Sequence, residues 1–277
     1  MNKILLLADQ SLNSGDYLQR AFHLARINDA VITGLFVQDT ALADYYTVLG
    51  GEPLYYEHMF DVIKETLNES EAKTVESIRY FVARCKEERI RFTVHFRKGN
   101  PLDEVVRESR SADVLLMGYH LYHSLGGDNQ AALVKDTLKM SFCPVLLMPE
   151  SGYNPDGVVL CYDGSDSSLR AIERFYHLFK PHCRQWPVHI VEVNEVGSAH
   201  SKVDKSYGDL LRLRFANLEW VTLKGKAGEE LPYFARQKGN QLLVMGAFGS
   251  GGIKRFLKGS TADHLLSTGN ILAFITH

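Results

Sequence analysis

The sequence contains the same succession of segments twice, and this internal repeat limits the possible folds more than any other feature. Each half opens with an apolar run that ends in an aspartate, continues to a run that ends in Met-Gly, and closes with a short apolar run. We therefore expect two copies of one fold in tandem. The matching runs are 3–9 with 157–163, 113–118 with 241–246, and 145–148 with 271–274.

These runs are short and continuously apolar, which is typical of strands buried on both faces of a parallel sheet. Helical patterns separate them. Apolar residues recur with helical spacing over 59–88, and Asn100 followed by Pro101 is a favourable helix start. Strands that alternate with helices predict βαβ units with right-handed crossovers. The predicted fold class is α/β: two tandem Rossmann-like (HUP-type) domains, each a five-stranded parallel sheet with helices on both faces.

A polar segment that contains glycine and proline, residues 150–157, is suited to a linker, so we expect domains at 1–150 and 156–277. The expected strands are 3–9, 31–37, 92–98, 113–119 and 143–149, then 158–163, 188–193, 219–225, 241–247 and 271–277. Further helices are expected at 100–109, 228–238 and 260–268.

The first half has roughly thirty extra residues between its second and third strands, comprising an aromatic segment, Tyr45–Phe60, and a full helix. At the matching place the second half is expected to have only a short or irregular connection, around 203–217. We expect the aromatic segment to pack over the first half or to seal the join between the halves. A lid over an apolar ligand is the alternative.

A glycine-rich stretch, residues 246–261, follows the fourth strand of the second half with the pattern G-x2-G-x9-G-S. It lies at the carboxyl end of the predicted sheet, where open α/β folds bind ligands. Glycines let main-chain N–H groups approach an anion, and a helix that begins near Ser260 adds unpaired donors. Lys254, Arg255 and Lys258 could supply positive charge. The stretch therefore predicts a phosphate site, with a flexible surface loop as the alternative.

The sequence resembles the universal stress proteins over nearly its whole length, twice. Members of that family that bind nucleotides carry G-x2-G-x9-G-(S/T) after the fourth strand, and Asp163-Gly164-Ser165-Asp166 after the first strand adds to the resemblance. The resemblance implies a stress-response regulatory protein that binds ATP or another adenine nucleotide, with or without Mg²⁺, in its C-terminal half. It places Asp163 near the ribose, Val193 near the base and the glycines around the phosphates. The implied nucleotide-binding residues are Asp163, Val193, Met245, Gly246, Gly249, Gly259, Ser260 and Thr261.

The corresponding stretch of the first half, residues 118–132, lacks these features. Ala131 and Ala132 stand at the Gly-Ser position, and Asp128 adds negative charge where a phosphate would lie. We therefore expect the first half not to bind a triphosphate. Asp9 and Val37 remain, but an aspartate at a strand end can equally cap a turn.

Other signals point away from metal sites, nucleic acid and membranes. His177, His182, Cys183 and His189 match no reliable zinc spacing. The net charge is −2 with dispersed basic residues, and no apolar stretch approaches the ~18 residues of a membrane span. Four scattered cysteines and the short apolar run at the N-terminus favour a reducing, cytoplasmic location without a signal peptide.

The sequence shows neither a P-loop nor a G-x-S-x-G motif, and we assign no catalytic residues. Slow ATP hydrolysis would be compatible with the main interpretation. The alternatives are an ATP-using ligase or nucleotidyl transferase, and a scaffold that binds no nucleotide. Universal stress proteins commonly dimerise through their last strands, so the resemblance implies that the two halves pair through theirs. A homodimer of the whole chain and an unidentified protein partner are further possibilities.

Overall fold

The structure, a computed structural model, describes residues 1–8, 12, 16–40, 57–119, 121, 128–149, 155–180, 182–194, 205–246 and 271–276. For residues 57–67, 128–132 and 205–206 it describes the backbone alone.

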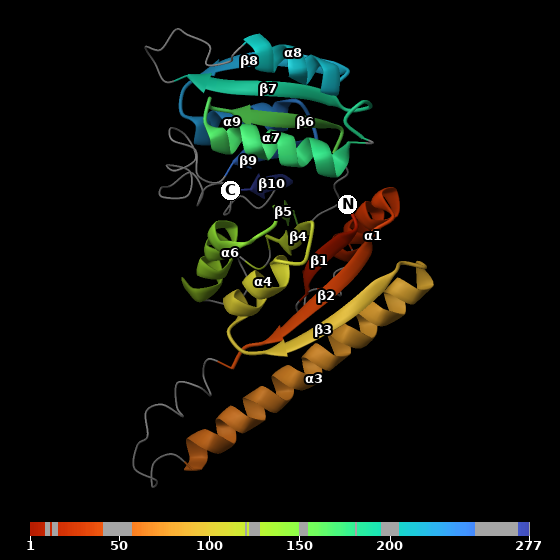
Figure 1. The fold of residues 1–277 in the computed structure, drawn as a ribbon. Coiled ribbons are helices and arrows are strands. Elements are labelled where there is room, and N and C mark those ends of the chain that lie inside the picture. Colours follow the sequence, from red (N-terminus) through yellow and green to blue (C-terminus); the bar gives the residue numbers. More distant parts are fainter. Residues whose placement is uncertain are drawn as a thin grey trace.

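One continuous ten-stranded sheet runs through both halves in the order β3-β2-β1-β4-β5-β10-β9-β6-β7-β8 (Figure 1). Read outward from the centre, each half has the same strand order, which confirms the predicted repeat and the α/β class. The strands are β1 Lys3–Ala8, β2 Val31–Gln38, β3 Phe92–Lys98, β4 Val114–Gly118, β5 Val145–Met148, β6 Gly157–Tyr162, β7 Pro187–Asn194, β8 Asn217–Lys224, β9 Gln241–Gly246 and β10 Ala273–Thr276.

The two halves join through β5 and β10, which are antiparallel, with Leu146 opposite Phe274. The strand pairs within each half are parallel. The pairing of the last strands predicted from the family resemblance is therefore confirmed. It joins what would otherwise be two exposed sheet edges.

Helices cover both faces of the sheet, and each face has one apolar core shared by the two halves. Helices α1, α3 and α7 and the end of α8 pack on one face, and α4, α6 and α9 pack on the other. The helices are α1 Asp16–Asn28, α3 Glu57–Glu87, α4 Pro101–Ser109, α6 Asp128–Met140, α7 Asp166–Phe179, α8 Lys205–Arg214 and α9 Ala227–Gln237.

The connection around 203–217 departs from expectation. In place of a short or irregular link, it contains α8, a helix of ten residues. Leu211 is fully buried, and Tyr207, one turn earlier, stacks on Tyr162 with ring centroids 6.2 Å apart. Tertiary packing of these two residues stabilises a helix whose sequence, with Gly208 inside it, has a weak helical pattern. The predicted helix at 260–268 lies outside the described residues.

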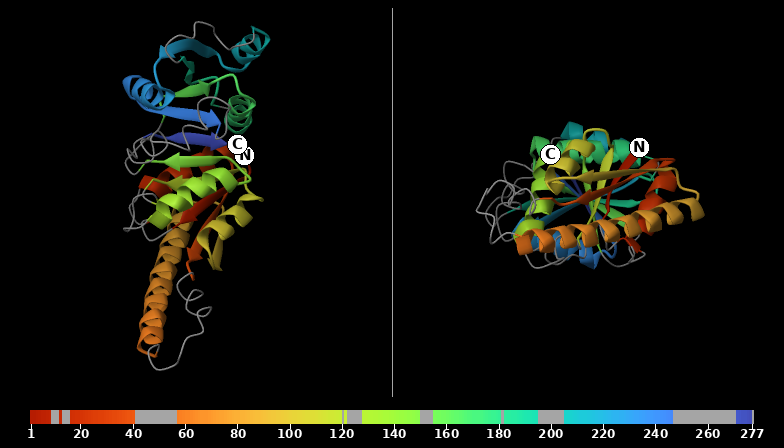
Figure 2. Two further views of the ribbon diagram at one scale, coloured as in Figure 1. Left: turned by 90° about the vertical axis from the view of Figure 1, so that its left-hand side faces the viewer. Right: turned by 90° about the horizontal axis from the view of Figure 1, so that it is seen from below.

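The extra helix of the first half is α3. It lies along β3 at the outer edge of the sheet and extends well beyond it (Figure 2). Phe81 anchors the helix, since its buried ring meets Phe36 of β2 and Phe92 of β3, each at a centroid distance of 5.8 Å. Of the aromatic segment Tyr45–Phe60, residues 45–56 lie outside the described part of the chain and 57–60 are described by their backbone alone, so its expected packing stays a prediction.

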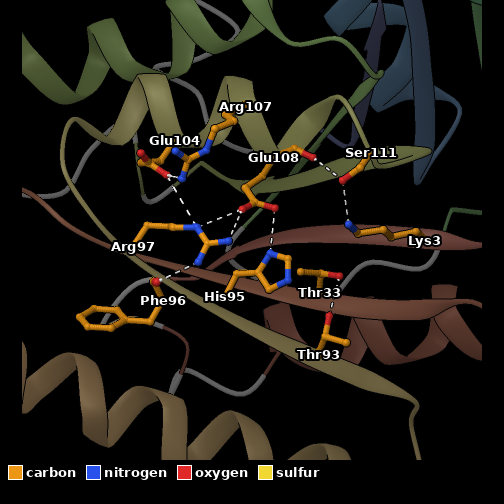
Figure 3. A network of polar contacts seen from close by, with 10 residues as sticks. All are labelled: Lys3, Thr33, Thr93, His95, Phe96, Arg97, Glu104, Arg107, Glu108 and Ser111. Carbon is orange, nitrogen blue, oxygen red and sulfur yellow. Dashed lines mark hydrogen bonds and ion pairs between the residues drawn. The ribbon is translucent and has the colours of Figure 1, made fainter.

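A polar network ties the edge strand β3 to α4 (Figure 3). The buried carboxylate of Glu108 accepts hydrogen bonds from Arg97 Nη2 at 2.9 Å and pairs with His95 Nδ1 at 2.8 Å. Burial alone would raise the pKa of Glu108, but the hydrogen bonds and charges of His95 and Arg97 outweigh it and lower that pKa. These side chains therefore hold charge close to a sheet edge, where it opposes pairing with another chain.

Candidate functional site

The sheet brings several of the expected site residues of the second half to one rim. β6 lies between β7 and β9, and all three strands are parallel, so their carboxyl ends share this rim. Asp163 follows β6 directly, Asn194 ends β7 and Gly246 ends β9. Ligands of open α/β sheets bind outside such carboxyl ends.

Asp163 organises the turn into α7. Its Oδ1 accepts hydrogen bonds from the main-chain N–H of Ser165 at 3.0 Å and from the Ser165 hydroxyl at 2.5 Å. Ser165 is the N-cap of α7, and its Oγ also accepts the N–H of Ser168 at 3.2 Å. The turn thus orients the positive end of the α7 dipole at the rim. Asp163 therefore caps this turn, which is the role that an aspartate at a strand end can have.

Gly246 is required by packing. A Cβ on this residue would lie 2.5 Å from the carbonyl carbon and oxygen of Ser167, in the first turn of α7. Only glycine lets the end of β9 come so close to that helix. The glycine-rich stretch therefore starts beside the N-terminus of α7.

Two other expected site residues serve the core. Met245 is 1% exposed and packs in the apolar cluster on the α9 face of the sheet. Val193, half-buried near the end of β7, packs against the same cluster. The side chain of Val193 remains partly exposed near the rim, so a ligand could still contact it. Four expected residues lie outside the described part of the chain: Gly249, Gly259, Ser260 and Thr261.

Asn194 is a rim residue that sequence analysis did not single out. It is 6% exposed, and its side-chain oxygen is buried without a hydrogen-bond partner among the described residues. A buried acceptor without a donor is costly, so a ligand donor could satisfy it. An asparagine at the end of a strand has no sequence signature that would have revealed it.

At the first-half rim, Gly118 ends β4 as expected, and Val37 lies in β2. Ala131 and Ala132 lie within the first five residues of α6, one turn past its start at Asp128. Asp9 lies outside the described residues. The absence of triphosphate binding in this half remains a prediction.

The cluster of histidines and a cysteine in the sequence does not converge in space. Cys183 is buried on the α7 face of the sheet, whereas His189 packs against Phe234 of α9 on the other face. His177 is exposed, and His182 stacks on Trp186. Within the described ranges, no three His, Cys, Asp or Glu side chains are grouped to hold a metal ion.

All four cysteines are buried and free. Burial raises the pKa of Cys143 to about 11 and those of Cys85 and Cys183 to about 12, and it also raises that of Cys161. A thiol with such a pKa is protonated near neutral pH and is a poor nucleophile. Among the helices that the structure describes, none is long and apolar enough to cross a membrane.

Comparison with known proteins agrees with this geometry. The family model described as "Universal stress protein family" matches residues 1–149 and 156–271. Among solved structures, the chain is similar to a universal stress protein from Archaeoglobus fulgidus DSM 4304, with 19% identity, a TM-score of 0.66, and coverage of 99% of this chain and 96% of that one. It is also similar to a putative universal stress protein from Pseudomonas aeruginosa UCBPP-PA14, with 15% identity, a TM-score of 0.55, and coverage of 100% and 93%. A search of curated proteins found no match.

Proposed function

Because the chain belongs to the universal stress protein family, we propose that it is a stress-response regulator whose C-terminal half binds one adenine nucleotide at the rim formed by β6, β7 and β9. The observation that carries this proposal is the contact of Gly246 with the first turn of α7. It starts the G-x2-G-x9-G-S stretch beside a helix N-terminus, which is a favourable place for phosphate oxygens.

The remaining rim residues suit the other parts of a nucleotide. The carboxylate of Asp163 can accept hydrogen bonds from ribose hydroxyls, as the family resemblance implies. Val193 offers apolar surface to the base. Gly249, Gly259, Ser260 and Thr261 would surround the phosphates with main-chain donors, and the nucleotide would be ATP or a relative of it, with or without Mg²⁺.

Titration calorimetry with ATP, ADP and AMP, in the presence and absence of Mg²⁺, tests the proposal on the full chain. We expect one site per chain. A ligand that binds only the folded state at a concentration of 100 times its Kd stabilises that state by about 2.7 kcal/mol, which is a thermal shift of several degrees. No binding at millimolar nucleotide would overturn the proposal and favour a scaffold.

Matched variants test which half binds. Gly249→Val and Gly259→Val place side chains on the expected phosphate approach and should abolish binding. His120→Val and Ala131→Val change the corresponding stretch of the first half and should leave binding intact. Two equivalent sites per chain would contradict the expected loss of binding in the first half. Fast nucleotide turnover would instead support the ligase or transferase alternative.

A further inference from the structure

The two outer edges of the sheet differ in how they are protected. β3 is the outermost strand of the first half, and β8 is the outermost strand of the second half (Figure 1). Among the strands that the structure describes, β3 pairs only with β2, and β8 pairs only with β7. Each outer strand therefore has a row of main-chain N–H and C=O groups with no described strand beside it. Such a row is a template for pairing with another chain.

The edge at β3 is protected by a helix and by charge. The long helix α3 lies along it (Figure 2), and His95 and Arg97 of the strand belong to the charged network with Glu108 (Figure 3). Lys98, at the end of the strand, forms an ion pair with Glu71 of α3, with 2.8 Å between Nζ and Oε2. A strand that paired here would remove water from these charges, so this edge resists pairing.

The edge at β8 has much less protection in the described part of the chain. The helix at the place that matches α3 is α8, which has 10 residues where α3 has 31. The charged residues of β8, Glu219 and Lys224, stand toward its two ends, and the stretch between them, Trp220–Leu223, is uncharged. Aromatic and β-branched residues such as Trp220, Val221 and Thr222 favour strands. An uncharged outer strand of eight residues is a favourable place for strand pairing.

The pairing of β8 with β7 fixes which of its main-chain groups point outward. The N–H of Gly225 donates a hydrogen bond to the carbonyl of Asn194, at the end of β7, at 3.1 Å. The carbonyl of Lys224 belongs to the same planar trans peptide group, so it points away from β7. Directions alternate from one residue to the next along a strand. The residues whose N–H and C=O groups point outward are therefore Leu218, Trp220, Thr222 and Lys224.

We propose that β8 is the interface of a homodimer, in which it pairs antiparallel with β8 of a second copy about a twofold axis at Val221. In this register Trp220 lies opposite the partner's Thr222, and Leu218 lies opposite the partner's Lys224. All of these residues have outward main-chain groups, so the two members of each pair exchange both of their hydrogen bonds.

The side chains suit this register. Trp220 opposite the partner's Thr222 is a pair of an aromatic and a β-branched residue, which is favourable across strands. Glu219 lies opposite the partner's Leu223, and Lys224 lies opposite the partner's Leu218, so no like charges face each other directly.

Two features of the molecule favour a second copy of this chain over a different partner. The chain already joins its own two halves by an antiparallel pair of equivalent strands, β5 and β10. A twofold pair of identical edges also closes on itself, because the same strand is used in both copies. Since the edge at β3 is protected, assembly stops at the dimer.

Sedimentation equilibrium of the full chain measures this assembly. We expect twice the chain mass of 31.2 kDa at a concentration of about 100 µM, where a dimer with a micromolar Kd is nearly complete. Thr222→Pro removes an N–H that points outward and leaves the pairing with β7 in place, so it should reduce the mass to that of one chain. Thr222 is exposed, which makes the change tolerable for the fold.

The matched control is Lys98→Pro at the other edge. The N–H of Gly99 donates to the carbonyl of Gln38 at 3.1 Å, so the main-chain groups of Lys98 also point outward from the sheet. Lys98→Pro therefore removes an outward N–H from β3, and the mass should stay that of the dimer.

Charge variants at Val221 test the register without proline. In the proposed register this residue faces its own copy across the twofold axis. Val221→Lys and Val221→Glu each place like charges opposite one another, so each variant alone should have the mass of one chain. An equal mixture of the two should recover the dimer, because a lysine then faces a glutamate. Recovery requires folded chains, so it distinguishes lost pairing from lost folding.

Each of the other outcomes would overturn the proposal. A single-chain mass for the unaltered protein at about 100 µM would exclude the dimer. A dimer that survives both Thr222→Pro and Val221→Lys would place the interface on another surface, and masses above the dimer would contradict a closed pair. A mixture that stays monomeric would contradict the twofold axis at Val221. None of the proposed nucleotide residues lies in β8, so these variants should leave nucleotide binding intact.

Discussion

Gly246 at the end of β9 lies so close to Ser167 of α7 that a Cβ on the glycine would be 2.5 Å from the carbonyl carbon and oxygen of Ser167. Gly246→Ala should therefore push the first turn of α7 away from the sheet and lower the free energy of unfolding by about 1–3 kcal/mol. Urea denaturation would measure the loss, as a lower midpoint.

The double variant Gly246→Ala/Ser167→Ala shows whether the main chain of Ser167, and not its hydroxyl, causes the steric conflict with a side chain at position 246. Removing the Ser167 hydroxyl leaves its carbonyl in place, so the double variant should be no more stable than Gly246→Ala. Full recovery of stability would mean that the hydroxyl alone causes the conflict, and that the end of β9 tolerates a side chain.

Two equivalent helices, α4 and α9, start differently, and this difference should be measurable. Asn100 caps α4, with its side-chain oxygen accepting the N–H of Leu102 at 2.9 Å, whereas Lys226, at the N-cap of α9, makes no such bond. Asn100→Ala should cost about 1 kcal/mol, and Lys226→Asn should gain about 1 kcal/mol. The matched control is Lys226→Ala, which should be nearly neutral. If Lys226→Ala lowered the free energy of unfolding as much as Asn100→Ala, the difference in capping between the two helices would be contradicted.

The seam between the two halves, where β5 pairs with β10, depends on Phe274 of β10. Its ring is fully buried and meets the rings of Phe175 and Phe179 at centroid distances of 5.7 and 6.0 Å. Phe274→Ala should cost about 3–5 kcal/mol and raise amide hydrogen exchange in β5, the strand paired with β10. Phe215→Ala removes an equally large buried ring away from the seam. If both variants raise exchange in β5 to the same extent, the seam has no special role.

Two histidines, His189, which is buried, and His182, which is half-buried, should make the protein less stable in mild acid. Burial lowers the pKa of His189, the charge of Lys238 lowers it further, and Glu219 only partly offsets both; burial and the nearby His23 lower that of His182. In the unfolded chain these histidines take up protons near pH 6.5, whereas the folded chain resists them. The unfolded state therefore binds more protons, and the free energy of unfolding should fall as the pH drops below about 6.5.

Histidine variants test whether these two side chains cause the predicted fall in the free energy of unfolding at low pH. In a series of urea denaturations from neutral pH downward, His189→Gln and His182→Gln should each make the decline shallower. His177→Gln is the matched loss of a histidine from the surface, where its side chain is 69% exposed. A decline as steep in His189→Gln as in the unaltered protein would exclude His189 as a source.

Most of the fold could be predicted because the strands are short apolar runs that occur twice. The predicted strand 92–98 matches β3, and the other predicted strands agree with the structure to within two residues at either end. Helix α8 was missed because Leu211 and Tyr207 form it through tertiary contacts, which a weak local pattern does not show. The Gly-rich pattern located the rim at Gly246, but not the reason for this glycine, which is the Ser167 main chain of a distant segment.

The burial of Arg20 has no local signal in the sequence. Arg20 reads as an ordinary helix residue, because its burial depends on Pro149 and on side chains from the other half. Asn194 was missed for the same reason. Met245 illustrates the reverse case: its neighbourhood in the motif suggested a ligand, while its side chain is packed in the core.

The antiparallel pair of β5 and β10 has one more consequence. Since every other pair in the sheet is parallel, the strands of the two halves end at opposite rims. The rims formed by the carboxyl ends of the strands in the two halves therefore lie on opposite sides of the sheet. A ligand bound at one rim does not obstruct the other rim. Mutations could therefore accumulate at the rim of one half without blocking ligand binding at the rim of the other half.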